Sequence, residues 1–260
     1  MTPMTSGMSF HDLHHQSAPL LLPNAWDVPS ALAFAHAGFA AVGTTSFGVA
    51  CAAGRPDGVR ASAEPNLRLA AGMARLECHV TMDIEDGYAD DPEQVADYAA
   101  RLPVAGVNIE DSTAERLIPA RAHAAKVAAV KRRCPGLFVN ARVDTYWLKE
   151  DATAEATLAR AAAYVAAGAD GVFVPGVTDS ELMRILAAEI TVPLNVLAVP
   201  GMPLAELGAL GVRRVSTGSL AYRAAMHAAT EAAVAMRDGG PVPAATPYDE
   251  LQARLTGFVG

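Results

Sequence analysis

The sequence predicts a (β/α)8 barrel of the TIM type. Short apolar runs of β-forming residues alternate with helical segments at roughly 25–35-residue intervals, the spacing of βα units. Eight such runs occur in 260 residues, a length typical of one such barrel. Several helical segments end at a glycine shortly before the next strand, as at Gly38, Gly168 and Gly211. An open doubly wound sheet is the alternative, but no G-x-G-x-x-G motif follows the first strand.

The expected strands are all short and rich in aliphatic residues: Leu20–Pro23, Ala40–Thr44, Val80–Ile84, Gly106–Ile109, Leu137–Ala141, Gly171–Val174, Leu194–Leu197 and Arg214–Thr217. The expected helices fall between and after them: Val28–Ala37, Pro65–Leu76, Pro92–Leu102, Ile118–Arg132, Ala152–Ala167, Asp179–Ala188, Leu204–Leu210 and Leu220–Met236. Prolines near three helix starts agree with these boundaries, because proline is well tolerated in the first helical turn.

The domain organisation predicted from this pattern has three parts. Residues 1–18 read as a flexible leader without a secretory signal, and residues 19–237 as the catalytic barrel. Residues 238–260 read as a Gly/Pro linker followed by an amphipathic helix, Tyr248–Phe258. This last helix is not needed to complete a barrel, so it either packs on its own barrel or reaches a partner subunit.

Composition excludes several classes of function. The net charge is −8 and no stripe of Lys and Arg occurs, which argues against nucleic-acid binding. No apolar run approaches the roughly 18–20 residues of a membrane span. The three cysteines lack C-x-x-C spacing, so neither a disulfide framework nor a zinc site is expected, and a reducing cytoplasm is the expected location.

Acidic residues follow the third and fourth expected strands. Asp83 and Glu85 are two residues apart, which would place both on one face of an extended segment. Glu110 ends the next strand. Because carboxylates gathered at a barrel mouth repel one another, and no His or Cys accompanies them, we expect a hard cation, Mg²⁺ with Mn²⁺ as the alternative.

Other polar residues near strand ends are candidates for binding an anion. Arg142 offers a planar fork for a carboxylate or phosphate, and an ion pair with Glu110 is compatible with that role. The small residues Thr44, Thr45 and Ser46 would let backbone N–H groups approach a carboxylate. Two further candidates are Asp57, either beside the metal or in an ordinary turn, and Asn195, a buried amide in need of partners. No lysine lies in an expected strand, which disfavours Schiff-base chemistry.

The combined pattern resembles the isocitrate lyase/phosphoenolpyruvate mutase superfamily, in its phosphonomutase-like branch. The segments that carry the resemblance span most of the chain: Pro23–Asp27, Gly43–Ser46, Gly54–Asp57, Asp83–Tyr88, Gly106–Asp111, Asn140–Asp144 and Pro193–Val196. The resemblance implies a Mg²⁺-dependent enzyme that makes or breaks a C–C or P–C bond next to a 2-oxo acid through a metal-stabilised enolate. It also implies a homotetramer (a dimer of dimers) in which the terminal helix is exchanged between subunits.

Carried over by position, the resemblance assigns roles to individual residues. Asp57, Asp83, Glu85 and Glu110 match the acids that hold the metal and its waters, with Glu85 in place of the usual aspartate. Arg142 matches the arginine that faces the substrate oxygens, and with Glu110 and Asp57 it forms the expected catalytic set. Trp26, the Thr44–Ser46 turn and Asn195 complete the expected substrate site.

Two departures from the family pattern limit the choice of reaction. The loop Ser112–Pro119 lacks the cysteine of the lyases that cleave isocitrate or methylisocitrate, which disfavours those two substrates. Val172–Gly176 lacks the histidine of the mutases, which disfavours phosphonomutase activity. The leading hypothesis is a lyase, decarboxylase or hydrolase acting on a small 2-oxo acid or substituted malate-type diacid. The alternatives are a phosphoenolpyruvate- or phosphonopyruvate-processing enzyme and a non-catalytic 2-oxo acid binding protein. Glu115, Arg116 and Tyr88 are loop candidates for the missing acid or base.

Overall fold

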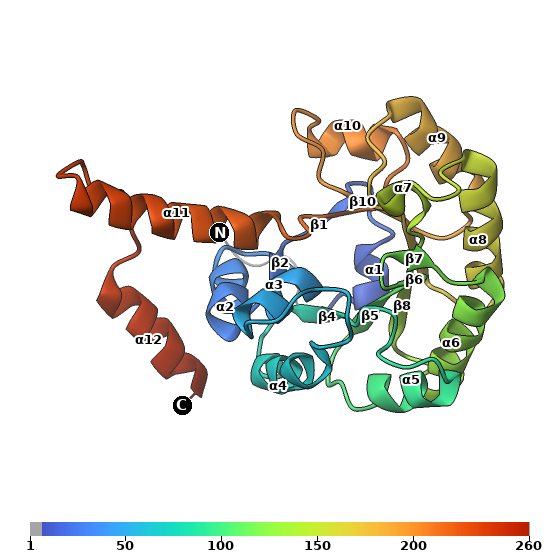
Figure 1. Cartoon of the computed structure of the whole chain (residues 1–260), viewed down its shortest axis with the longest axis horizontal. Helices are drawn as coiled ribbons and strands as arrows, with labels where there is room; N and C mark the ends of the chain where they lie inside the picture. The colour runs from blue at the N-terminus through green and yellow to red at the C-terminus, as the bar shows by residue number, and fades with distance from the viewer. Residues whose placement is uncertain (1–6, 260) are drawn as a thin grey trace.

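A ring of parallel strands forms the centre of the molecule in the computed structural model, which describes residues 7–259 (Figure 1). The first strand is split by Pro23, which lacks an N–H, into β1 (Leu20–Leu22) and β2 (Asn24–Ala25). β1 pairs with the last strand, β11 (Arg214–Ser216), and β2 pairs with β3 (Ala41–Thr44). These two pairings close the sheet, so the predicted (β/α)8 barrel is confirmed.

The remaining strands of the ring follow one another around the barrel in chain order: β4 (His79–Asp83), β5 (Gly106–Glu110), β8 (Phe138–Arg142), β9 (Gly171–Phe173) and β10 (Leu194–Leu197). The helices outside the ring are α2 (Val28–His36), α3 (Ser46–Ala52), α4 (Ala63–Met73), α5 (Pro92–Ala99), α6 (Ala120–Arg133), α7 (Thr145–Leu148), α8 (Ala154–Ala166), α9 (Ser180–Glu189) and α10 (Leu204–Ala209). All eight expected strands occur, with shifts of one or two residues at their ends.

Three short elements at the carboxyl end of the barrel were not expected from the sequence. α3 and α7 lie in the loops after β3 and β8, at the carboxyl end of the barrel. A small hairpin, β6 (Ser112–Thr113) with β7 (Arg116–Leu117), follows β5. The two residues at its tip, Ala114 and Glu115, both have positive φ, which non-glycine residues rarely adopt. All three elements lie at the end of the barrel where loops carry function.

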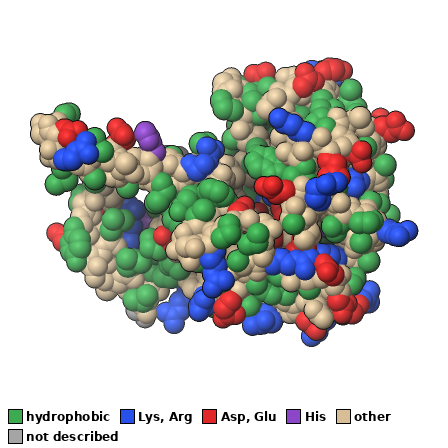
Figure 2. Space-filling model, in the orientation of Figure 1, with side chains coloured by type: hydrophobic (Ala, Val, Ile, Leu, Met, Phe, Trp, Pro, Cys, Tyr) green, Lys and Arg blue, Asp and Glu red, His purple; other side chains and the backbone are tan. Residues whose placement is uncertain are grey.

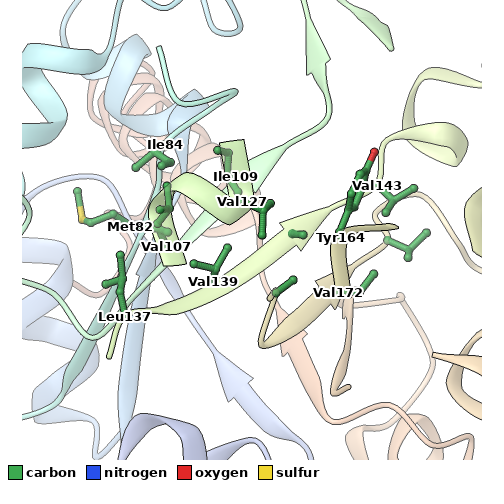
Figure 3. Close-up of a cluster of buried hydrophobic side chains, with 14 of the residues drawn as sticks. Met82, Ile84, Val107, Ile109, Val127, Leu137, Val139, Val143, Tyr164 and Val172 are labelled. Atoms are coloured by element: carbon green, nitrogen blue, oxygen red, sulfur yellow. The ribbon is translucent and has the colours of Figure 1, made fainter. Parts of the chain in front are cut away.

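Outward-facing side chains of the strands form the main apolar core (Figure 3). The side chains of Met82, Val107 and Val139 point outward from the barrel. They are fully buried, together with Val127 of α6 and Tyr164 of α8. Burying a side chain of this size contributes roughly 1.5–3 kcal/mol. The shell between strands and helices therefore holds the fold together.

The opposite end of the barrel is closed by α1 (Phe10–Leu13). Its Phe10 packs edge-on against Phe138, with ring centroids 5.3 Å apart, and His14 stacks on Phe138 at 4.1 Å. This plug was not predicted within the expected flexible leader, because only two apolar residues of the helix, Phe10 and Leu13, mark it. Residues 1–6 of that leader lie outside the described residues.

The last two helices, α11 (Leu220–Arg237) and α12 (Tyr248–Val259), project from the barrel as an arm (Figure 1). Both were expected, within one residue at each end. The arm exposes large apolar side chains, including Met236 and Tyr248. Arg75 Nη1 donates a hydrogen bond to the backbone oxygen of Val259 at 3.2 Å. Among residues 7–259, no helix is long and apolar enough to cross a membrane.

Candidate active site

A cavity of about 650 Å³ opens at the carboxyl end of the barrel, and acidic side chains show within the hollow at the centre of this face (Figure 2). Its walls carry the predicted residues Thr44, Thr45, Ser46, Asp57, Asp83, Glu110 and Arg142. These side chains come from the ends of four neighbouring strands and the loops that follow them. The structure thus brings together seven of the ten residues predicted for the site.

Asp83 is the last residue of β4, and it lines the cavity. Its backbone N–H donates to Thr44 Oγ1 at 2.9 Å, and its Oδ1 accepts from the backbone N–H of Glu85 at 3.1 Å. Burial raises the pKa of Asp83 to about 7; Arg142 opposes this shift, and repulsion from Asp57 adds to it. A nearby cation would therefore stabilise the ionised form of Asp83.

Glu110 and Arg142 face each other across adjacent strands. Arg142 Nη1 lies 2.8 Å from Glu110 Oε2, and Arg142 Nε donates to Asp144 Oδ1 at 2.6 Å. The predicted ion pair is present, and Arg142 lines the cavity as well. Burial acts to lower the pKa of Arg142, but Asp144 and Glu110 outweigh it and raise that pKa. The guanidinium is thus fixed in a charged form at the cavity wall.

Burial also shifts the pKa values of two other acids of the cavity, Asp57 and Glu110. It raises the pKa of Asp57, with hydrogen bonds from Ser46 and Gly58 acting in the opposite direction. Burial raises the pKa of Glu110 well above its ordinary value. Arg142 opposes this shift, and repulsion from Asp144, Asp83 and Asp57 adds to it. Three acids that repel one another in one cavity favour a bound cation.

Glu85 does not share a face with Asp83, and that expectation is wrong. β4 ends at Asp83, and Glu85 adopts a φ of +49°, so the segment is not extended there. The Glu85 carboxylate accepts from the backbone N–H of Arg60 at 2.8 Å and from the hydroxyl of Ser62. It is buried and is not part of the cavity wall. Glu85 thereby secures the loop that follows Asp57.

Two other predicted residues lie outside the cavity wall. Trp26 packs edge-on against Tyr222 of α11, with ring centroids 5.4 Å apart. Asn195 is buried in the barrel, where its Oδ1 accepts from Ser216 Oγ at 3.2 Å. Its Nδ2 has no hydrogen-bond partner among residues 7–259. In this structure Trp26 braces α11, and Asn195 lies below the cavity floor.

The Thr44–Ser46 segment opens α3 instead of forming a plain turn. Thr45 is the N-cap, and the first backbone hydrogen bond of the helix runs from the Val49 N–H to the Thr45 oxygen. The N–H groups of Ser46 and Phe47, which precede it, belong to residues of the cavity wall. Early N–H groups of a helix have no intrahelical acceptor, so they suit an anionic oxygen.

Asp86 organises the loops around the cavity, a role that the sequence did not reveal. Arg60 donates to both of its carboxylate oxygens, Thr113 Oγ1 donates to Oδ2 at 2.6 Å, and Lys126 Nζ donates to its backbone oxygen at 2.8 Å. Lys126 is buried in α6 beside Val127. A lysine on an apolar helix face was the one available signal. Asp86 thus joins the loops after β3, β4 and β5.

The loop candidates for an acid or base separate in the structure. Glu115 lines the cavity from the tip of the β6–β7 hairpin. Arg116 lies 3.3 Å from Glu150, and Tyr88 is held by Ser62 at 2.9 Å, away from the cavity wall. Of the three, Glu115 alone has access to a ligand in the cavity.

The acids suit a hard cation held largely through water. Among the residues described, no three His, Cys, Asp or Glu side chains form a ready cluster of direct metal ligands. The cavity nevertheless offers carboxylate oxygens from Asp57, Asp83 and Glu110, whose pKa values are all raised. Mg²⁺ keeps several waters and takes one or two carboxylates directly, so this donor set fits it.

Comparison with known proteins agrees with the geometry. An uncharacterised Mycobacterium tuberculosis protein is 57% identical over 251 residues, which cover 96% of this chain and 97% of that one. The 2-methylisocitrate lyase of Bacillus subtilis is 30% identical over 192 residues, covering 68% of this chain and 63% of that enzyme. The solved structure of a candidate phosphonomutase from Burkholderia cenocepacia is 37% identical, with a TM-score of 0.80, and covers 87% of this chain and 97% of that one.

The family model for phosphoenolpyruvate phosphomutase matches residues 10–237, which run from α1 to the end of α11. The matched segment includes the whole barrel and every residue of the cavity wall named above. Relatives in this group include lyases and a decarboxylase as well as mutases. This chain belongs to the phosphoenolpyruvate phosphomutase family, within the isocitrate lyase/phosphoenolpyruvate mutase superfamily of enzymes.

Proposed function

We propose that this protein is a Mg²⁺-dependent lyase that acts on a small 2-oxo acid or a substituted malate-type diacid. C–C cleavage, decarboxylation and hydrolysis next to the oxo group are the reactions that fit this site. The observation that carries the proposal is the convergence of Asp57, Asp83 and Glu110 with Arg142 around one cavity. The oxaloacetate decarboxylase relative supports it, since oxaloacetate is a 2-oxo acid. The 2-methylisocitrate lyase relative supports lyase chemistry but not that substrate, because the loop Ser112–Pro119 lacks the cysteine.

The chain's own residues supply binding and charge stabilisation. Arg142 presents its fork at the cavity wall, where it can hold a substrate carboxylate while Glu110 and Asp144 fix its orientation. The N–H groups of Ser46 and Phe47 offer a second place for carboxylate oxygens. Together these groups would orient a short anionic substrate and stabilise charge that develops on its oxygens.

Asp83, Asp57 and Glu110 are the residues that would hold the ion, and Glu85 would act only indirectly, by supporting the neighbouring loop. When bound, the ion would act as a Lewis acid toward the carbonyl and carboxylate oxygens of the substrate. Mn²⁺ should substitute for Mg²⁺, because both prefer oxygen ligands in octahedral geometry. Proton transfer is assigned to Glu115, which reaches the cavity from the hairpin tip.

The proposal is tested by turnover of a panel of 2-oxo acids and malate-type diacids with Mg²⁺, followed by product analysis. We expect product from at least one member, loss of turnover with chelator, and recovery with Mn²⁺. Turnover that persists in chelator would contradict the metal assignment. Tight oxalate or pyruvate binding with no product from any member would favour the alternative of a non-catalytic binding protein.

A phosphonopyruvate- or phosphoenolpyruvate-processing enzyme is the second candidate. Its support is the family model and the candidate phosphonomutase among similar structures. The end of β9 argues against it, because Val174, Pro175 and Gly176 stand where the mutases carry a histidine. Phosphorus NMR of both compounds with the Mg²⁺-loaded protein distinguishes the candidates: an unchanged spectrum excludes the second.

The arm motivates a proposal about assembly. The exposed apolar side chains of α11 and α12, such as Met236 and Tyr248, would be covered if the terminal helix packed on a neighbouring subunit. We propose a homotetramer built as a dimer of dimers. Light scattering measures the mass of the assembly, which should be that of a tetramer. Deletion of residues 238–260 should reduce this mass. A monomeric mass for the full chain would contradict the proposal.

A further inference from the structure

The barrel interior at the base of the cavity is polar, which is unusual for this fold. Branched apolar residues normally fill the centre of a (β/α)8 barrel. Here inward positions on β5, β8, β10 and β11 carry Asn108, Asn140, Asn195 and Arg214, all at most 5% exposed. Buried polar groups are costly unless they are hydrogen-bonded, so this layer has a purpose that packing alone does not explain.

Arg214 is the central residue of this polar layer. It is fully buried, and its side chain spans the barrel from β11 toward β5. Its Nη2 donates to Asn108 Oδ1 at 3.1 Å, and its Nε donates to Ser216 Oγ at 3.3 Å. Within residues 7–259 it has no carboxylate within 4.0 Å. The best acceptor that this buried cation has is therefore the amide oxygen of Asn108.

The contact with Arg214 determines which way the Asn108 amide points. A guanidinium has only donors, so the group facing it is the amide oxygen and not the amide nitrogen. Asn140 Nδ2 also donates to Asn108 Oδ1, at 2.9 Å. With both donors on the oxygen side, Asn108 Nδ2 is directed away from Arg214 and Asn140.

Asn108 is itself part of the cavity wall, between the acids. It pairs in register with Asp83 on β4, and Glu110 follows two residues later on the same face of β5. Its Nδ2 has no acceptor among the described residues, yet it is not among their fully buried unpartnered atoms. The amide N–H therefore reaches the cavity, as an uncharged donor beside carboxylates.

A glycine keeps Asn140 in the position from which it holds Asn108. A Cβ added to Gly171 on the adjacent strand would lie 2.8 Å from Asn140 Oδ1, closer than real Cβ contacts allow. Asn140 therefore packs flat over this glycine, with its nitrogen toward Asn108. The chain thus fixes Asn108 from two sides, through Arg214 and through Asn140.

We propose that Asn108 is a substrate-binding residue whose Nδ2 donates to an oxygen of the 2-oxo acid, and that Arg214 is the positioning residue that sets its orientation. The inference rests on the proposed function, because it names a further donor for the same substrate. It also explains the buried arginine: Arg214 holds the Asn108 oxygen away from the cavity, where it would repel an anionic substrate.

Asn108→Asp is the sharpest test, because it changes one atom while keeping the shape. The new carboxylate still accepts from Arg214 and Asn140, so we expect a folded protein. It presents an oxygen to the cavity in place of an N–H, so oxalate, the probe, should bind roughly 10- to 100-fold more weakly, as expected for a lost hydrogen bond to a charged group. Mn²⁺ affinity, followed by electron paramagnetic resonance, should not weaken.

Arg214→Met tests the positioning role. Without the guanidinium, Asn108 is free to turn, so oxalate affinity should fall while Mn²⁺ affinity stays within about twofold. Arg214→Lys should recover part of the oxalate affinity, because an ammonium also donates to the amide oxygen. Lys131→Met is the matched control: it removes a cation from Asp170, 2.7 Å away and outside the cavity wall, and should lower the melting temperature without changing oxalate affinity.

The outcomes separate the two proposals. If the wild-type protein binds no oxalate with Mg²⁺ or Mn²⁺ present, the proposed function fails, and this inference fails with it. If the wild-type protein binds oxalate and Asn108→Asp binds it equally well, only the inference is overturned. If Asn108→Asp loses oxalate while Arg214→Met binds it normally, Asn108 remains a ligand and the role of Arg214 is refuted.

Discussion

The inward and outward faces of the same strands differ sharply in this barrel. On β4, β5 and β8 the outward residues, such as Met82, Val107 and Val139, are apolar and pack under the helices (Figure 3). Toward the carboxyl ends of these strands the inward residues that alternate with them are polar or charged, among them Asp83, Asn108 and Arg142. Because side chains alternate along a strand, the outward residues stabilise the fold and the inward residues form the candidate active site. Substitutions on the two faces should therefore affect different measurements.

Asp83→Asn should have the largest effect on turnover. It removes a carboxylate from the proposed metal site, so we expect Mg²⁺-dependent turnover to fall by at least about 100-fold, as for other groups that stabilise charge in a transition state. The metal-free protein should become more stable at pH 8, because a buried and repelled charge is lost. Steady-state kinetics and thermal melting measure the two effects; full turnover in the variant would contradict the assignment.

Asp86→Ala should cost the most stability, because it leaves the buried Lys126 ammonium without its carboxylate. We expect a loss of about 3–5 kcal/mol in the free energy of unfolding, measured with urea. Asp90 is the matched control, since it also pairs with Arg60 but is 91% exposed. Asp90→Ala should cost far less than Asp86→Ala, because a solvent-exposed ion pair contributes little to stability. Equal losses in the two variants would refute the role given to Asp86.

Ile109→Val tests the outward face with a small change. Ile109 is fully buried in the shell, so removing one methylene should cost about 0.5–1.5 kcal/mol in the free energy of unfolding. Ile109 faces away from the cavity. The oxalate affinity of the Ile109→Val variant with Mg²⁺, measured by calorimetry, should therefore match that of the wild type. A clear loss of affinity would show that the two faces are not independent.

The pH dependence of stability tests the inward face without a substitution. The pKa of Asp83 is raised from 3.8 to about 7, so the folded metal-free protein binds more protons than the unfolded chain between these values. Its free energy of unfolding should therefore fall as pH rises through that window. Mg²⁺ needs the ionised form, so the rise in melting temperature on adding Mg²⁺ should be larger at pH 8 than at pH 5.5. An equal rise at both values would count against Asp83 as a metal ligand.

The fold could be predicted because each strand is marked locally by its aliphatic run, and most helices by their periodicity. α3 could not, because Gly48 interrupts the helical pattern of Ser46–Ala52. The cavity acids were predictable from their places at strand ends. The position of Glu85 was not, since a positive φ in a charged loop leaves no trace in the spacing of residues.

The contacts of Asn108 and Arg214 show a different limit. These residues are 106 positions apart in the chain, and their hydrogen bond exists only because the barrel closes. Each strand on its own gives no reason to connect them. The same holds for Asp86, whose partners come from three separate segments. The site residues at strand ends could be predicted from the sequence. The hydrogen bonds that support them could not, because they form only when the barrel closes.

We propose that the inward acids bind a divalent cation, and that binding of a 2-oxo acid or its analogue depends on this cation. Calorimetric titration of oxalate into the wild-type protein, with Mg²⁺ and with chelator, tests it most directly. We predict binding with Mg²⁺, none with chelator, and none for Asp83→Asn under either condition. Oxalate binding that is equally tight in chelator, or unchanged in Asp83→Asn, would contradict the claim.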